Sequence, residues 1–369
     1  MKDKDAYTPT EEGLTRYLRR QICGNELVNR SKISSITVLL TYRCPAACDH
    51  CIFESDSTRT ETLNIEVARK FIEAAARQDP PPSLSFSGGE PFLQREMLRE
   101  LACYAQTLGM PCEVISSGAW AKTPEFAHTV LSDLADCGLR TYCMSVDRYH
   151  LPFVSPKNLR NALFSALDVG LRVVLNTMVD PCSLGEEDAY LATALGVAPD
   201  VIARCQVNRL TTAPVGRARS NVRDFLYQNK SFREGCPFAT EIVTLSPYGL
   251  LYPCCGMVLG ENPHDAALFI QDNLSDRSVD EIEAILDDLK SDLFYRLLQA
   301  LGPYRLLNEV IRRDPTITVR DRFVGSCDVC LEFTTNSRVA EGTRKLLIEY
   351  ARILYGSEPV AVSHNPVSD

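Results

Sequence analysis

Three cysteines lie close together near the start of the chain. Cys44, Cys48 and Cys51 have the spacing C-x3-C-x2-C and directly follow the apolar run Ile36–Leu40. Thiolates on a single loop can converge on one metal centre, and soft sulfur ligands favour zinc or an iron–sulfur cluster. A structural zinc ion needs a fourth ligand, for which His50 is the nearby candidate. The triplet fits better with a [4Fe–4S] cluster whose fourth iron stays open for a ligand.

A glycine pair and a carboxylate follow the next predicted strand. Residues 84–93 read LSFSGGEPFL, in which Gly88 and Gly89 allow the backbone to approach a ligand closely. Glu90 supplies a carboxylate acceptor at the same point. Taken alone, such a pair of glycines is usually only a turn.

The two motifs together resemble those of the radical S-adenosylmethionine (radical SAM) enzymes. In that family three cysteines hold a [4Fe–4S] cluster whose open iron binds the amino and carboxylate groups of SAM. An electron from the cluster cleaves SAM, and the resulting 5′-deoxyadenosyl radical abstracts a hydrogen from the substrate. The resemblance therefore implies that the cysteine triplet ligates the cluster. It assigns SAM binding to Gly88, Gly89, Glu90 and Pro91.

Weaker SAM-binding candidates occur where the later strands are expected to end. By resemblance, Ser117, Ser145, Asp147 and Asn176 occupy positions at which relatives contact SAM, although Ser117 replaces an asparagine. His50 stands where the family prefers an aromatic residue beside the adenine. Each of these residues could instead be part of strand-end turn chemistry.

Two further clusters are candidates for contact with the substrate. The segment Asp147–His150 reads DRYH, and we expect Tyr149 and His150 to hold substrate or move a proton, or else to be structural loop residues. Arg217 and Arg219 lie in a Gly-Arg-Ala segment that resembles one in many relatives. Arginine suits carboxylate or phosphate recognition, and a solvated basic loop is the alternative.

A second cysteine set lies in the C-terminal third of the chain. Cys236 and Cys254 lie on either side of Gly249 in the spacing C-x12-G-x4-C. Cys327 and Cys330 then form a C-x2-C pair. Four thiolates can complete a fully ligated auxiliary [4Fe–4S] cluster, or bind zinc. The spacing resembles the SPASM/twitch extension of radical SAM enzymes, in its shorter twitch form, because no cysteine follows Cys330. Cys255 is an alternative to Cys254.

Composition limits the remaining possibilities. A length of 369 residues suggests about two domains, and a net charge of −9 argues against a nucleic-acid or membrane-surface binder. The chain has no apolar run of membrane-spanning length and no signal peptide, which predicts a cytoplasmic protein. Its 15 cysteines then indicate metal ligation rather than disulfides. Most of those outside the two sets are predicted to be small buried hydrophobes, and Cys182, in the loop after the fifth predicted strand, is expected near the cavity. The cysteines outside the two sets are Cys23, Cys103, Cys112, Cys137, Cys143, Cys182 and Cys205.

Short β-branched runs alternate with amphipathic stretches of helical period. The predicted strands are Ile36–Thr41, Leu84–Ser87, Glu113–Ser116, Thr141–Val146, Val173–Val179 and Cys205–Leu210. The predicted helices are Ile65–Arg77, Gln94–Leu108, Pro124–Cys137, Pro156–Val169 and Glu187–Leu195. Such α/β repeats imply a parallel sheet, either doubly wound or barrel-like. The resemblance implies a partial (β/α)6 barrel with its chemistry at the carboxyl ends of the strands.

We divide the chain into four parts. Residues 1–33 are an N-terminal helical extension with a helix at Glu11–Cys23, and residues 34–219 are the partial barrel. Residues 220–355 are an α+β twitch-like domain, and residues 356–369 are a disordered tail. The C-terminal domain is predicted to contain a hairpin at Glu241–Pro253 and helices at Val279–Ala300, Tyr304–Arg312 and Thr343–Tyr355.

These features predict a radical SAM enzyme with one auxiliary [4Fe–4S] cluster and a reductant such as flavodoxin or ferredoxin. The N-terminal extension is too short for the leader-peptide-binding module of many peptide-modifying relatives. This favours oxidation or rearrangement of a small biosynthetic intermediate. Modification of a ribosomal peptide, by cross-linking or epimerisation, is the second hypothesis. A non-catalytic Fe–S or zinc protein is the third.

Overall fold

The computed structural model describes residues 32–179, 185–223, 225, 236, 238–254 and 272–356. The predicted N-terminal helix, Cys182, Cys255 and the tail from residue 357 onward lie outside the described residues.

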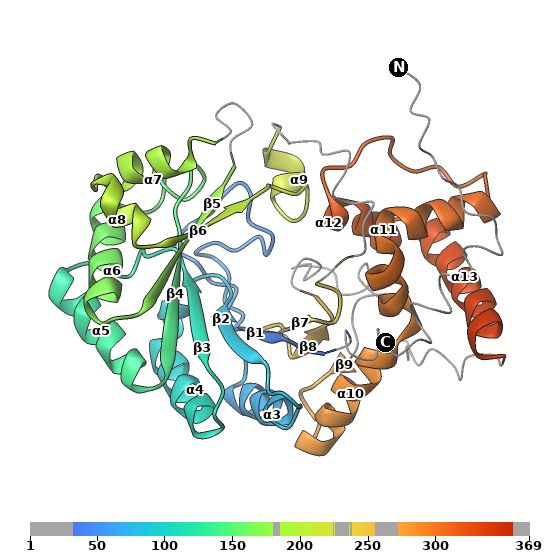
Figure 1. The fold of residues 1–369 in the computed structure, drawn as a ribbon, viewed down its shortest axis with the longest axis horizontal. Coiled ribbons are helices and arrows are strands. Elements are labelled where there is room, and N and C mark those ends of the chain that lie inside the picture. Colours follow the sequence, from blue (N-terminus) through green and yellow to red (C-terminus); the bar gives the residue numbers. More distant parts are fainter. Residues whose placement is uncertain are drawn as a thin grey trace.

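Six strands alternate with helices, as the sequence pattern predicts. The strands are β1 (Ser35–Leu39), β2 (Ser83–Ser87), β3 (Cys112–Ser116), β4 (Leu139–Ser145), β5 (Arg172–Met178) and β6 (Gln206–Leu210). The helices between them are α3 (Ile65–Ala76), η1 (Pro91–Gln94), α4 (Arg95–Thr107), α5 (Pro124–Asp136), α6 (Pro156–Asp168), α7 (Glu187–Leu195) and α8 (Pro199–Ala203). Neighbouring strands are parallel, in the order β6-β5-β4-β3-β2-β1, and α3 to α8 lie along the outer side of the sheet (Figure 1). The fold is of the α/β class predicted for a radical SAM core.

Local capping explains where three of the helices begin. The side chains of Asn64, Thr123 and Ser155 accept hydrogen bonds from backbone N–H groups in the first turns of α3, α5 and α6. Proline occupies the first turn of both α5 and α6, where its missing N–H costs no helical bond. Each of these side chains therefore satisfies a backbone N–H that has no partner within its helix.

The C-terminal hairpin extends the same sheet. Strand β7 (Ile242–Leu245) pairs in parallel with β1, and β8 (Leu250–Tyr252) and β9 (Asp272–Asn273) follow in antiparallel order. The hairpin itself was predicted, but its pairing with β1 was not. As a result β1 is an interior strand, and Ile36, Val38 and Leu39 are fully buried.

The C-terminal helices depart from the predicted boundaries. The helix predicted over Val279–Ala300 is wrong, because Asp292 ends α10 (Val279–Ser291) and caps α11 (Leu293–Arg313) by accepting from the N–H groups of Phe294 and Tyr295. A short α9 (Ala218–Asn221) and α12 (Ser326–Thr335) were not predicted, and α13 (Ser337–Tyr355) begins earlier than expected. Among the residues described, no helix combines the length and hydropathy that crossing a bilayer requires.

One pair of cysteines corrects the sequence interpretation. Cys103 on α4 and Cys137 at the end of α5 form a disulfide, with a Cα–Cα distance of 4.2 Å. They are therefore not the independent small hydrophobes that we expected. Cys112 and Cys143, by contrast, are free and buried on β3 and β4.

Candidate active site

The cysteine triplet lies on the loop that follows β1. Cys44 and Cys48 are buried and Cys51 is half-buried, and they form a small cluster with Ala46 and Tyr149 that is distinct from the main hydrophobic core. The backbone N–H of Ala46 donates to the Cys44 Sγ at 3.4 Å. Three thiols and an N–H···S contact in one enclosed place match the ligand chemistry of an iron–sulfur cluster.

Burial disfavours the ionised form of the first thiol of the triplet. Burial, together with the neighbouring charges of Glu90, Cys48 and Cys51, raises the pKa of Cys44 to about 12. A free thiolate would therefore be costly here, whereas metal coordination removes the proton and compensates the negative charge. The three sulfurs are soft donors of the kind that an iron–sulfur cluster binds.

Gly88 and Gly89 lie against the backbone of the cysteine loop. A Cβ atom on Gly88 would come closer than 3.0 Å to the carbonyl oxygen of Thr41, and one on Gly89 would do the same to that of Arg43. Two hydrogen bonds join the segments: Gly89 N–H donates to Thr41 O at 2.6 Å, and Glu90 N–H donates to Arg43 O at 2.9 Å. The glycines therefore fix the second motif directly on the first.

The Glu90 carboxylate ties β2 to the end of β3. It is buried and accepts hydrogen bonds from Ser116 Oγ at 2.9 Å, from Ser117 N–H at 3.0 Å, from Ser117 Oγ, and from Phe92 N–H at 3.3 Å. Burial raises the pKa of Glu90, and these donors oppose that rise. Ser117, the predicted SAM contact, is thus bound to Glu90, while Pro91 begins η1 directly behind it. The contribution of Ser116 was not predicted.

The DRYH segment after β4 packs on the cysteine loop. Asp147 is buried and accepts from the N–H groups of Tyr149 and His150, and His150 Nδ1 lies 3.0 Å from both carboxylate oxygens. The Tyr149 ring stacks on His50 at 4.6 Å, and His150 meets His50 edge-on at 4.9 Å. One nitrogen of each histidine and the Cys48 sulfur lie within 4.8 Å of one another. The sequence candidates Tyr149, His150, Asp147 and His50 are therefore assembled at Cys48.

Two pKa shifts follow from this arrangement. Burial by itself would raise the pKa of Asp147, but the adjacent His150 holds it below its ordinary value. Burial lowers the pKa of His50 to about 4, so its ring is neutral near pH 7. Among the described residues, the buried His50 Nδ1 finds no hydrogen-bond partner. A buried polar atom left without a partner fits a site that a bound group completes.

Ser145 and Asn176 lie side by side but apart from these contacts. They are partners in the register of β4 and β5, and the Asn176 side-chain oxygen accepts from Asn208 Nδ2 on β6 at 3.1 Å. Their predicted SAM contact stays a prediction.

The segment after β6 also contacts the cysteine loop, in addition to the glycine segment after β2. Gly216 has φ +54°, and a Cβ atom there would come within 2.6 Å of the Cys51 carbonyl oxygen. Arg217 N–H donates to that same carbonyl at 3.0 Å, and its guanidinium donates to Cys48 O and Ser55 O, both at 2.9 Å. From the sequence, we expected the Arg217 side chain either to recognise a ligand or to lie in a solvated loop. Instead, this half-buried side chain binds backbone carbonyls of the cluster loop.

We expect Arg217→Ala to lower the iron content and thermal stability of the reconstituted protein. The change removes two charge-assisted hydrogen bonds, each worth about 2 kcal/mol, and leaves the Cys48 and Ser55 carbonyls without that donor. Arg217→Lys keeps the charge but not the two-pronged geometry, so it should fall between wild type and alanine. Equal iron content in all three proteins would contradict this role.

The second cysteine set also converges. Burial, and then the charges of Cys236, Cys327 and Cys254, raise the pKa of Cys330 well above its ordinary value. Cys327 and Cys330 lie on α12, whereas Cys254 follows β8. Residues far apart in the sequence therefore bring their sulfurs within electrostatic range of one another.

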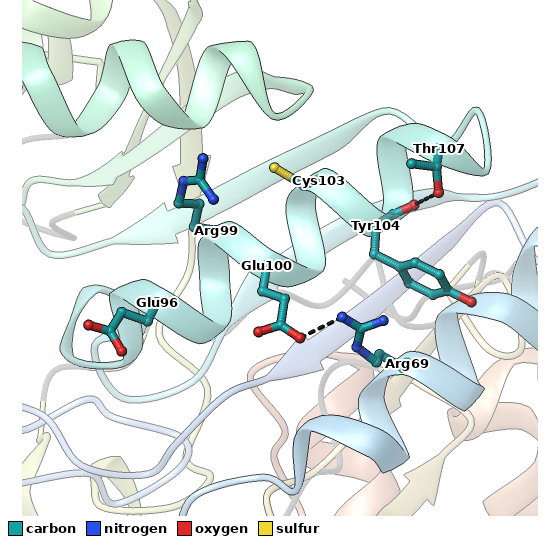
Figure 2. A pocket seen from close by; sticks show the side chains of 7 residues that line it. All are labelled: Arg69, Glu96, Arg99, Glu100, Cys103, Tyr104 and Thr107. Carbon is teal, nitrogen blue, oxygen red and sulfur yellow. Dashed lines mark hydrogen bonds and ion pairs between the residues drawn. The ribbon is translucent and has the colours of Figure 1, made fainter.

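A separate pocket lies on the outer surface between α3 and α4 (Figure 2). Its walls are mainly charged side chains, including the 2.5 Å ion pair between Arg69 and Glu100. None of the residues that line it is a predicted site residue, so this pocket is not where the cysteines and strand-end motifs meet.

The fold and the site define an α/β protein with a cysteine-lined centre at the carboxyl ends of its parallel strands. Residues 38–196 match the family model of the Radical SAM superfamily, so this part of the chain is a radical SAM domain. That family implies a [4Fe–4S] cluster and SAM, which the cysteine triplet fits.

Similar proteins include YydG of Bacillus subtilis (strain 168), whose name assigns it to peptide biosynthesis. It is 25% identical over 305 residues, which are 80% of this chain and 90% of YydG. The PqqA peptide cyclase of Xanthomonas oryzae pv. oryzae (strain MAFF 311018) is 34% identical over 116 residues, and the match spans only 28% of that protein. The solved structure of anSMEcpe with bound AdoMet and Cp18Cys peptide covers 86% of this chain and 98% of its own, at 13% identity and a TM-score of 0.49.

Proposed function

We propose that this radical SAM enzyme modifies a peptide. The observation that carries the proposal is the similarity to YydG across 80% of this chain and 90% of that protein, because it spans both the barrel and the C-terminal part. The local match to a peptide cyclase supports the same substrate class. This reverses the order of the two substrate hypotheses drawn from the sequence, in which a small biosynthetic intermediate came first.

When bound, a [4Fe–4S] cluster with an open iron supplies the electron that cleaves SAM. The chain's own residues position and shield that site. Gly88 and Gly89 allow the strand-end segment to lie on the cysteine loop, and Arg217 fixes the loop's carbonyls. His50, beside Cys51 and stacked on Tyr149, offers its unpartnered Nδ1 and ring face to the bound cofactor.

The C-terminal set is proposed to hold one auxiliary [4Fe–4S] cluster. Its support is that Cys236, Cys254 and Cys327 all lie near enough to Cys330 for their charges to raise its pKa. We retain the division into a barrel at 34–219 and a twitch-like domain at 220–355, with the qualification that β7 to β9 continue the barrel's sheet. A cytoplasmic reductant such as flavodoxin or ferredoxin completes the proposal.

The test uses the protein reconstituted anaerobically, with SAM and dithionite, and with each short peptide that sequencing finds encoded beside its gene. We expect the peptide to increase formation of 5′-deoxyadenosine about tenfold or more and to change in mass or incorporate solvent deuterium. With the Cys48→Ala variant, the peptide should neither increase the formation of 5′-deoxyadenosine nor be modified. If a small metabolite increased 5′-deoxyadenosine formation and the peptide stayed unchanged, the substrate would instead be a small biosynthetic intermediate, as the sequence first suggested.

A further inference from the structure

A basic pocket of about 740 Å³ lies between the segment after β6 and helices α12 and α13. Four arginines line it: Arg219 from α9, Arg320 and Arg322 from the loop before α12, and Arg338 from α13. We refer to it below as the basic pocket.

The two carboxylates in the pocket wall both pair with the same arginine, Arg320. Arg320 Nε lies 2.7 Å from Glu332 Oε1, and its Nη1 lies 2.5 Å from Asp328 Oδ1. Both acids are nearly fully buried, so they are committed to Arg320. The pocket wall therefore carries four positive and two negative charges, a net positive charge.

The other arginines differ from one another in their partners. Arg338 pairs with Asp314 at 3.2 Å, outside the pocket wall. For Arg219 and Arg322, both exposed, no side-chain acceptor is found in the part of the chain that the structure describes. Two guanidinium groups from opposite walls are thus open to an anionic ligand, on a chain whose net charge is −9.

The pocket is adjacent to both cysteine sets. Arg219 follows by two residues Arg217, whose guanidinium binds the Cys48 carbonyl. The opposite wall includes Asp328 and Leu331 of α12, the helix that carries Cys327 and Cys330.

We propose that the basic pocket binds an Asp- or Glu-bearing segment of the peptide substrate. The proposal rests on the proposed peptide-modifying function. The planar guanidinium groups of Arg219 and Arg322 match carboxylates. Phe225 and Leu331 supply apolar wall against which aliphatic stems can pack. A volume of this size, with apolar wall between the arginines, suits several side chains rather than a lone phosphate.

The test measures binding by fluorescence anisotropy with a labelled peptide of about ten residues rich in Glu, against its Gln counterpart. We expect the Glu peptide to bind about tenfold tighter than the Gln peptide, and its binding to weaken as salt is raised from about 50 to 200 mM. The double variant R219E/R322E should lose that tenfold preference. The control R204E/R344E, which reverses two exposed arginines outside the pocket, should keep it.

Three results would overturn the proposal: equal binding of the Glu and Gln peptides, equal losses in the two double variants, or displacement by inorganic phosphate at lower concentration than by glutarate. The last would identify a phosphate site. Thermal unfolding checks that R219E/R322E is folded. Binding in this assay needs neither SAM nor turnover, so it can hold when peptide modification fails, and the two proposals fail separately.

Discussion

The triple variant Cys44/Cys48/Cys51→Ala is expected to form no detectable 5′-deoxyadenosine from SAM and dithionite. These cysteines are the candidate ligands of the cluster that SAM needs. Because they form a small group distinct from the main core, their loss should leave the chain folded. Iron and sulfide should be about eight each per wild-type chain and about four per variant chain, since the C-terminal set is untouched. Anaerobic reconstitution, metal analysis and chromatography of the nucleoside products provide the measurement.

Cys205→Ala is the matched control for this variant. Its thiol is free and half-buried before β6 and belongs to neither set, so iron content and SAM cleavage should equal those of wild type. Deoxyadenosine formed by the triple variant would exclude the triplet as the SAM-cleaving centre. Wild-type protein with about four irons plus zinc would instead reject the auxiliary iron–sulfur cluster and leave a one-cluster enzyme.

The local parts of the fold could be predicted because the forces that set them act over a few residues. The helical period of the apolar residues and the N-capping residues define α3, α5 and α6. At the start of each helix a side chain accepts a hydrogen bond from a nearby backbone N–H. Consecutive β–α units predict a parallel sheet, and the resemblance to radical SAM enzymes, rather than the spacing, predicts the sequential order from β1 to β6. Likewise, the Asp147–His150 contact spans only three residues, and the sequence placed both in one cluster.

The long-range contacts could not be predicted in this way. The pairing of β7 with β1 joins Ser35 to Ile242, and no period or cap specifies such a partner. The contact of Arg217 with Cys48 spans 169 residues. The sequence around a loop arginine is the same whether its side chain contacts a ligand, solvent or a backbone carbonyl, so only ligand recognition and a solvated loop were considered for Arg217. The Cys103–Cys137 disulfide was missed for a related reason, since neither cysteine belongs to a recognisable spacing.

The substitution Gly89→Ala is expected to destabilise the protein by about 3 kcal/mol and to reduce its iron content. The added methyl group would overlap the Arg43 carbonyl, so the two motifs must separate. Separation weakens the hydrogen bonds from Gly89 N–H to Thr41 O and from Glu90 N–H to Arg43 O, which hold the cysteine loop. Urea unfolding and iron analysis measure the two effects.

A matched glycine separates this steric effect from the general cost of adding a methyl group. Gly325, before α12, has an extended backbone at φ 179°, and a Cβ atom there would meet nothing within 4 Å. Gly325→Ala should therefore change stability by less than about 1 kcal/mol. If Gly89→Ala matched this control in both stability and iron content, the close approach of the two motifs would not be what positions the cysteine loop. If only stability fell, while iron and SAM cleavage per folded chain stayed normal, the loop would be held chiefly from its other side by Gly216 and Arg217.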